Sequence, residues 1–199
     1  GLQGLANLMV SPANFEFYRV RRTHALDQFD FPVDSLMPLR MAQLALEKFR
    51  EYDDLYQIAG AYVSIGKYLN AHGCYPEALD TLTKALDCVN QHHLLYYHYK
   101  ADTLDKLWPY AEGDTTYTGV PWITEEKVKT VPEWISRIRE QLSVSYAGLG
   151  MKHASDYNRN IYLDILNFTR QDKELENRKL SLEAGSRQMT LVLSLVIVG

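Results

Sequence analysis

Residues 61–86, AYVSIGKYLNAHGCYPEALDTLTKAL, place two amphipathic helical segments on either side of a glycine. Gly73 suits the left-handed backbone at which many helices end. Gly66 and Ala78 have little or no side chain, so two helices can approach closely there. Large residues recur at helical spacing on both sides of the turn, at Tyr62, Ile65, Leu69, Tyr75 and Leu82. The stretch therefore predicts an antiparallel helical hairpin.

This order of large, small, glycine, tyrosine and alanine positions resembles the tetratricopeptide repeat, a helical hairpin of about 34 residues. We expect the repeat to be packed by Tyr62, Gly66, Gly73, Tyr75, Ala78, Leu82 and Ala85. A weaker copy, LSVSYAGLGMKHASDYNRNIY at residues 142–162, places Tyr146 and Gly150 at matching positions, while Arg159 and Tyr162 depart from the pattern. The resemblance implies stacked hairpins. The alternative is another kind of helical bundle whose spacing reflects helical periodicity alone.

Helical periodicity extends over the rest of the chain up to its last residues. It predicts helices over about 12–29, 39–52, 54–71, 75–89, 93–108, 131–149 and 154–168. Thr130 and Glu133 form a capping box before the sixth of these. The segment 109–130 is long for a connection in a compact helical domain and is interpreted as an insertion. The prediction is an all-α, tetratricopeptide-like domain over residues 1–170.

Composition narrows the classes of function. The chain of 199 residues is 46% hydrophobic and carries a net charge of -4. It can therefore bury a core, but it offers no basic field for a nucleic acid, and no nucleic-acid partner is expected. Cys74 and Cys88 lie near opposite ends of one predicted helix, about 20 Å apart, which excludes a disulfide between them.

No constellation of acid, base and nucleophile appears in the sequence, so no catalytic residue and no cofactor are expected. His92, His93 and His98 lack the spacing of three or four that puts two metal ligands on one helix face, and no metal site is expected. Repeat arrays instead bind peptides along the face made by their first helices. The candidates for that groove are Lys67, Asn70, Tyr97, Lys100 and Arg139. The alternative is that these are ordinary solvated polar residues.

The C-terminal composition changes abruptly. Residues 171–188 are strongly polar and predict a connector helix, in which Leu175, Leu182 and Met189 recur at seven and permit a thin seam with a second copy. Residues 189–199, MTLVLSLVIVG, are almost all apolar but too few to span a membrane. They are interpreted as the start of a truncated transmembrane helix. A terminal buried helix or strand is the alternative.

Two segments, KFREYDDLYQIAGAY at 48–62 and SDYNRNIYLDILNFTRQDKELENR at 155–178, resemble the extracytoplasmic repeat domain of membrane sensor histidine kinases of the Bacteroides group. The resemblance covers about residues 40–199. It implies a periplasmic domain in the cell envelope, anchored to the inner membrane by a C-terminal helix. It also implies a homodimer through the connector helices and a kinase core after residue 199.

The expected function is thus a non-catalytic sensory or protein-interaction domain of a two-component sensor histidine kinase. Its ligand would be a protein, a peptide or a small molecule. The alternative is a membrane-anchored or soluble tetratricopeptide scaffold that binds a partner and has no signalling role.

Overall fold

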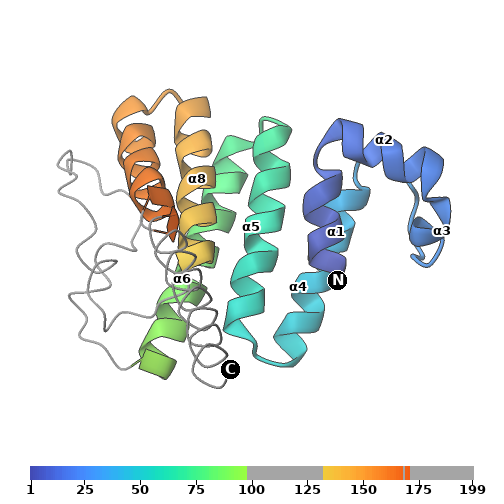
Figure 1. The fold of residues 1–199 in the computed structure, drawn as a ribbon, viewed down its shortest axis with the longest axis horizontal. Helices are drawn as coiled ribbons and strands as arrows, with labels where there is room; N and C mark the ends of the chain where they lie inside the picture. The colour runs from blue at the N-terminus through green and yellow to red at the C-terminus, as the bar shows by residue number, and fades with distance from the viewer. Residues whose placement is uncertain (98–131, 168, 171–199) are drawn as a thin grey trace, which may run out of the picture.

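The computed structural model describes residues 1–97, 132–167 and 169–170, and these residues contain helices and turns but no strand. The predicted all-α class is confirmed for this part of the chain. The helices are α1 (Leu2–Met9), α2 (Pro12–Arg21), α3 (Thr23–Leu26), α4 (Met37–Glu51), α5 (Leu55–Ala71), α6 (Tyr75–Tyr97), α8 (Pro132–Gly148) and a further helix over 152–167. Figure 1 shows the longer helices standing side by side.

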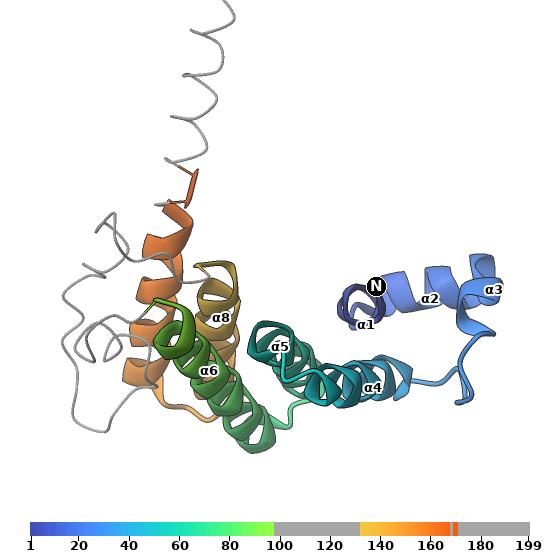
Figure 2. The same cartoon turned by 90° about the horizontal axis from the view of Figure 1, so that it is seen from below.

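The helices α1, α4, α5, α6 and α8 each pack on the next of the set in chain order. Helix α4 packs on α1 and α5, and α6 packs on α5 and α8. In addition, α5 contacts both α1 and α8. Seen from below, α1 and α8 lie on the same side of α5, whereas α4 and α6 lie on the other (Figure 2). The molecule therefore has a face formed by α1, α5 and α8.

Helices α5 and α8 end in the same way. Gly73 and Gly150 have φ angles of 75° and 74°, in the left-handed region that favours glycine. The amide that follows each glycine donates to a carbonyl five residues back, from Cys74 to Leu69 at 2.9 Å and from Met151 to Tyr146 at 2.9 Å. This bond satisfies a carbonyl left over at the helix end and reverses the chain into the next helix.

The turn between α4 and α5 uses an aspartate pair. Asp53 adopts a positive φ of 50°, and the amide of Asp54 donates to the Phe49 carbonyl at 3.2 Å. The Asp54 carboxylate then accepts a hydrogen bond from the Gln57 amide at 3.1 Å. Asp54 thereby caps the first turn of α5, where the helix dipole also favours a negative charge.

The main core lies between α5, α6, α8 and the helix of residues 152–167. Helices α5 and α6 approach closely at Gly66, where an added Cβ would lie 2.7 Å from two carbons of the Leu82 side chain. Ala78, Leu82 and Ala85 are fully buried at this contact. A second cluster packs α1 and α4 around Met9, Leu26, Met37 and Met41.

Some predicted helix bounds are wrong. Helix α1 was not predicted, and the helix expected over 12–29 is divided at Arg22, whose φ and ψ of -136° and 36° are not helical. Helix α2 has no buried residue, so packing does not favour its continuation past Arg22. The break at Arg22 allows Leu26 to reach the core. The break expected after Val89 is absent, since α6 continues to Tyr97.

Several predictions fall outside the described residues. They are the Thr130 capping box, the insertion 109–130, the polar connector 171–188 and the apolar tail 189–199. Among the helices that the structure does describe, none is both long and apolar enough for a membrane crossing. Cys74 and Cys88 are both free thiols, in agreement with their spacing.

Candidate functional site

The face formed by α1, α5 and α8 contains a hollow of about 220 Å³. Residues from all three helices line it, although they are far apart in the sequence. They are Asn7 of α1, Val63 and Lys67 of α5, and Arg137, Glu140 and Gln141 of α8. We call this hollow the groove. Five of its six lining residues are polar or charged, and they carry both signs of charge, which suits a peptide that presents charged side chains or backbone amides.

Lys67 connects two walls of the groove. Its ammonium donates to the Asn7 carbonyl of α1 at 3.5 Å, a long hydrogen bond across helices. Lys67 is half-buried, and its ammonium can exchange that carbonyl for a ligand's acceptor group because a lysine head is compact and flexible. Lys67, one of the residues predicted from the sequence for the groove, thus lines the hollow.

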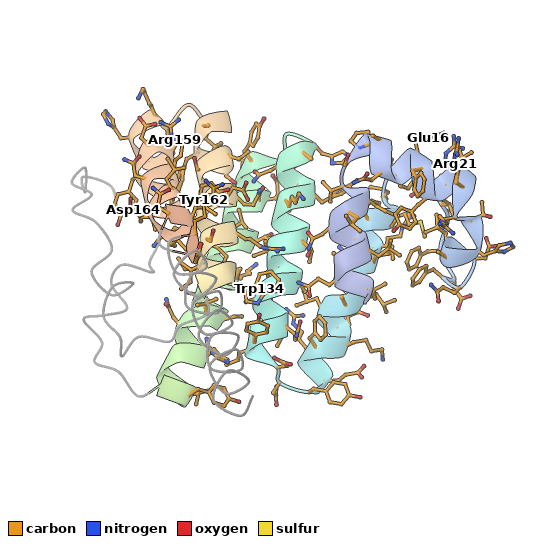
Figure 3. The ribbon with its side chains drawn as sticks, in the orientation of Figure 1. Glu16, Arg21, Trp134, Arg159, Tyr162 and Asp164 are labelled. Atoms are coloured by element: carbon orange, nitrogen blue, oxygen red, sulfur yellow. The ribbon has the colours of Figure 1, made fainter. Side chains whose placement is uncertain are left out.

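One end of the groove is closed by a contact between three helices. Gly60 of α5 has no side chain, and a Cβ there would lie 2.2 Å from Gln3 Nε2 and 2.5 Å from the Trp134 ring. The Trp134 side chain of α8 therefore packs against α5 at Gly60 and is 8% exposed. Figure 3 labels Trp134. The Arg137 guanidinium lies over this ring, 5.3 Å from its centroid. This cation–π contact holds the Arg137 guanidinium in place at the groove.

The opposite end is closed by a polar network. The amide nitrogen of Asn70 donates to the Gln141 carbonyl at 2.9 Å and to the Gln141 side chain at 3.2 Å. The Ser145 hydroxyl donates to Asn70 Oδ1 at 2.8 Å. Asn70 is only 7% exposed, so its predicted role as an open groove residue is wrong. It joins α5 to α8 instead.

Arg139 is also misplaced by the sequence prediction. Its side chain is fully buried, and its Nη1 donates to Asn158 Oδ1 at 2.8 Å. The guanidinium also lies 5.9 Å from the Tyr157 ring centroid. Both partners belong to the helix of residues 152–167, so Arg139 fixes that helix on α8 and does not face the groove. A buried charge needs such partners.

The remaining predicted residues fall into two sets. Tyr97 ends α6, but its side chain and the whole of Lys100 lie outside the described residues. Among the residues expected to pack the repeat, Tyr146 is buried, and Tyr62 packs against the core clusters. The Tyr75 ring occupies the space beside Gly148, where an added Cβ would lie 2.5 Å from it.

Sequence inspection missed the α8 wall of the groove. Arg137, Glu140 and Gln141 share one helix face, next to the buried Trp134 and Ile138. Their spacing of three and four was the available signal. Glu140 also influences Tyr162, which Figure 3 labels on the helix of residues 152–167. Burial and the negative charge of the Glu140 carboxylate raise the pKa of Tyr162.

The groove offers charge and hydrogen bonds without a catalytic arrangement among its six residues. Over residues 1–97 and 132–167, no three side chains of His, Cys, Asp or Glu lie close enough to hold a metal ion. His92 packs between the rings of Tyr56 and Tyr96, 6.1 and 4.6 Å from their centroids. Partial burial lowers its pKa.

Comparison with known families gives one match. Residues 52–199, most of the chain, match a family described as "Domain of unknown function (DUF5113)". The chain belongs to this family. The DUF5113 match includes α5 and α8, which supply two walls of the groove, and begins after α1 and α4. No curated protein and no solved structure matches the chain.

Proposed function

We propose that this DUF5113 chain is a tetratricopeptide-like repeat domain that binds a protein or peptide segment in the groove. Three pairs of packed helices support the repeat arrangement: α1 with α4, α5 with α6, and α8 with the helix of residues 152–167, to which Arg139 and Ser143 of α8 are hydrogen-bonded. In each pair the first helix contributes to the face that holds the groove. The equivalent turns at Gly73 and Gly150 add support from the backbone.

The single observation that carries this proposal is the hollow that crosses α1, α5 and α8. Successive first helices of a stacked array form a continuous concave surface, which such proteins use for binding. Because packed helices hold the side chains of this site in place, little of the binding free energy is spent on ordering the site when a ligand binds.

The proposed place of this domain is the periplasmic side of a membrane sensor histidine kinase. The resemblance of residues 48–62 and 155–178 to such receptors supports this role. A bound partner that prefers one arrangement of a dimer would shift the connector helices at 171–188 and so change the kinase output. The tail at 189–199 would begin the membrane helix. The kinase itself would follow residue 199.

Binding is tested with a displayed library of random peptides selected against the whole chain. Selected peptides are then titrated against Lys67→Glu and against Lys152→Glu, an exposed lysine of another helix. We expect Lys67→Glu to change the affinity about tenfold or more, because the reversed charge faces the ligand. Lys152→Glu should bind as the unchanged chain does. If the Lys67→Glu substitution left the affinity of the selected peptides unchanged, the groove would be refuted as their binding site.

Signalling is tested separately in the intact gene product. Sequencing beyond residue 199 shows whether a kinase core follows, and phosphorylation in native membranes is compared between the Lys67→Glu and Lys152→Glu proteins. A kinase whose response to its stimulus changes only with Lys67→Glu supports the sensor. A frame without a kinase core refutes the sensor and leaves the partner-binding scaffold.

A further inference from the structure

A second hollow, of about 390 Å³, lies between α4 and the segment that follows α3. It shares no residue with the groove. One wall is a stripe of α4 that includes Arg40, Leu44 and Glu47, spaced four and three apart on one helix face. The other wall includes Phe29, Asp30 and Phe31. The volume falls within the range of about 300–1,000 Å³ that is usual for small-molecule sites.

The segment wall is held in place by described contacts. Arg40 Nη1 donates to Asp34 Oδ1 at 2.7 Å and to the Pro32 carbonyl at 3.3 Å, which fastens the segment to α4. The rings of Phe29 and Phe31 stack with 5.4 Å between centroids and 15° between planes. Both rings pack on the core of α1 and α4. The aromatic wall is therefore formed without a ligand.

The charges at this hollow are unbalanced. Arg40 lines it, but the ion pair with Asp34 already offsets its charge. Asp30 and Glu47 are exposed, and neither forms an ion pair with any residue that the structure describes. Two carboxylates beside half-buried phenylalanine rings favour a positive charge, because both a carboxylate and the face of an aromatic ring attract cations.

We propose that this hollow binds a small organic cation, an ammonium or guanidinium group on an aromatic or aliphatic body. The body packs against Phe29, Phe31 and Leu44, and the cationic group lies at the carboxylates of Asp30 and Glu47. The site is independent of peptide binding in the groove. It also lies outside the residues that match the DUF5113 family.

The test is calorimetric titration of the whole chain with 2-phenylethylamine and with its uncharged counterpart 2-phenylethanol. We expect saturable binding of the amine and at least about tenfold weaker binding of the alcohol. The double variant Asp30→Asn/Glu47→Gln should weaken amine binding about tenfold, because it removes both charges. Glu77→Gln, which removes an exposed charge of α6, and Lys67→Glu in the groove should leave it unchanged.

Far-UV circular dichroism and melting curves show whether each variant remains folded. Phe31→Leu provides a second variant, which keeps an apolar side chain but removes a ring face, and it should weaken binding of the amine severalfold. Equal binding of amine and alcohol, or no loss in the double variant, would overturn the proposal. Binding of a lysine-containing peptide without binding of the free amine would also overturn it, since the occupant would then be a protein.

Discussion

The contact between Gly66 and Leu82 provides a test of how α5, which lines the groove, packs on α6. A Cβ at position 66 would lie 2.7 Å from both Cγ and Cδ2 of Leu82, well inside van der Waals contact. Leu82 is fully buried, so it has little room to move away. Overpacking of this kind costs about 1–3 kcal/mol. Alanine gains about 1 kcal/mol over glycine in helix propensity. Gly66→Ala should therefore lower the free energy of unfolding by about 1 kcal/mol.

Removing the Leu82 side chain should reverse the sign of that effect. Leu82→Ala alone should cost about 3 kcal/mol, within the range for a fully buried leucine. In that background a methyl group introduced at position 66 no longer meets Cγ or Cδ2, so only the gain in helix propensity remains. Gly66→Ala should then stabilise by about 1 kcal/mol. The coupling between the two positions is thus about 2 kcal/mol.

Urea unfolding followed by far-UV circular dichroism measures all four members of this cycle. Gly4→Ala is the matched control, because Gly4 lies in α1 with open space where its Cβ would be. This control should stabilise by up to about 1 kcal/mol in either background. If Gly66→Ala stabilised the unchanged chain as Gly4→Ala does, the close approach of α5 and α6 would be refuted.

Three further substitutions probe buried groups. Gln3→Leu should stabilise by about 1 kcal/mol in urea unfolding, because Gln3 Nε2 is buried without a hydrogen-bond partner. A loss of stability would contradict this. Burial raises the pKa of Cys88 from 9.0 to about 11. Stability should therefore fall as the pH rises through that interval, and Cys88→Ser should make the decline shallower, because Tyr68 and Tyr162, whose pKa values are also raised, contribute to it as well. At pH 8, dithionitrobenzoate should modify Cys88 far more slowly than Cys74, because the raised pKa of Cys88 leaves little thiolate, and equal rates would be inconsistent with that raised pKa. Asn70→Leu should cost about 1–3 kcal/mol, because it leaves the Ser145 hydroxyl without its acceptor on α5. An unchanged urea midpoint would show that this network contributes nothing.

The hairpin of α5 and α6 was accessible from sequence because its signals are local. Gly73 sets a positive φ, Asp54 precedes the first turn, and the apolar positions repeat at helical spacing. Helix α1 gave no comparable signal, since it has eight residues, no side-chain cap and Gly4 within it. The sequence pattern predicted a break in α6 between residues 89 and 93. No glycine or proline interrupts the helix there, and Val89 and Asn90 are buried within it.

The candidate site was predicted only in part, and the errors have a common cause. Lys67, Asn70 and Arg139 were all assigned to the face of the first helices, but of these three only Lys67 lines the groove. The partners of the other two, Ser145 and Asn158, lie on other helices, and no pattern near either residue identifies them. A buried polar side chain looks like an exposed one until its distant partner is known.

The position of α1 has a consequence for how the groove can vary. Two of its walls, α5 and α8, lie within residues 52–199, whereas the wall that contains Asn7 lies in the segment before them. The groove is thus assembled from a part shared with the DUF5113 family and a part attached in front of it. Exchanging the helices before residue 52 would change one side of the proposed binding surface and leave the other intact. Ligand preference could then be altered without disturbing the core that supports it.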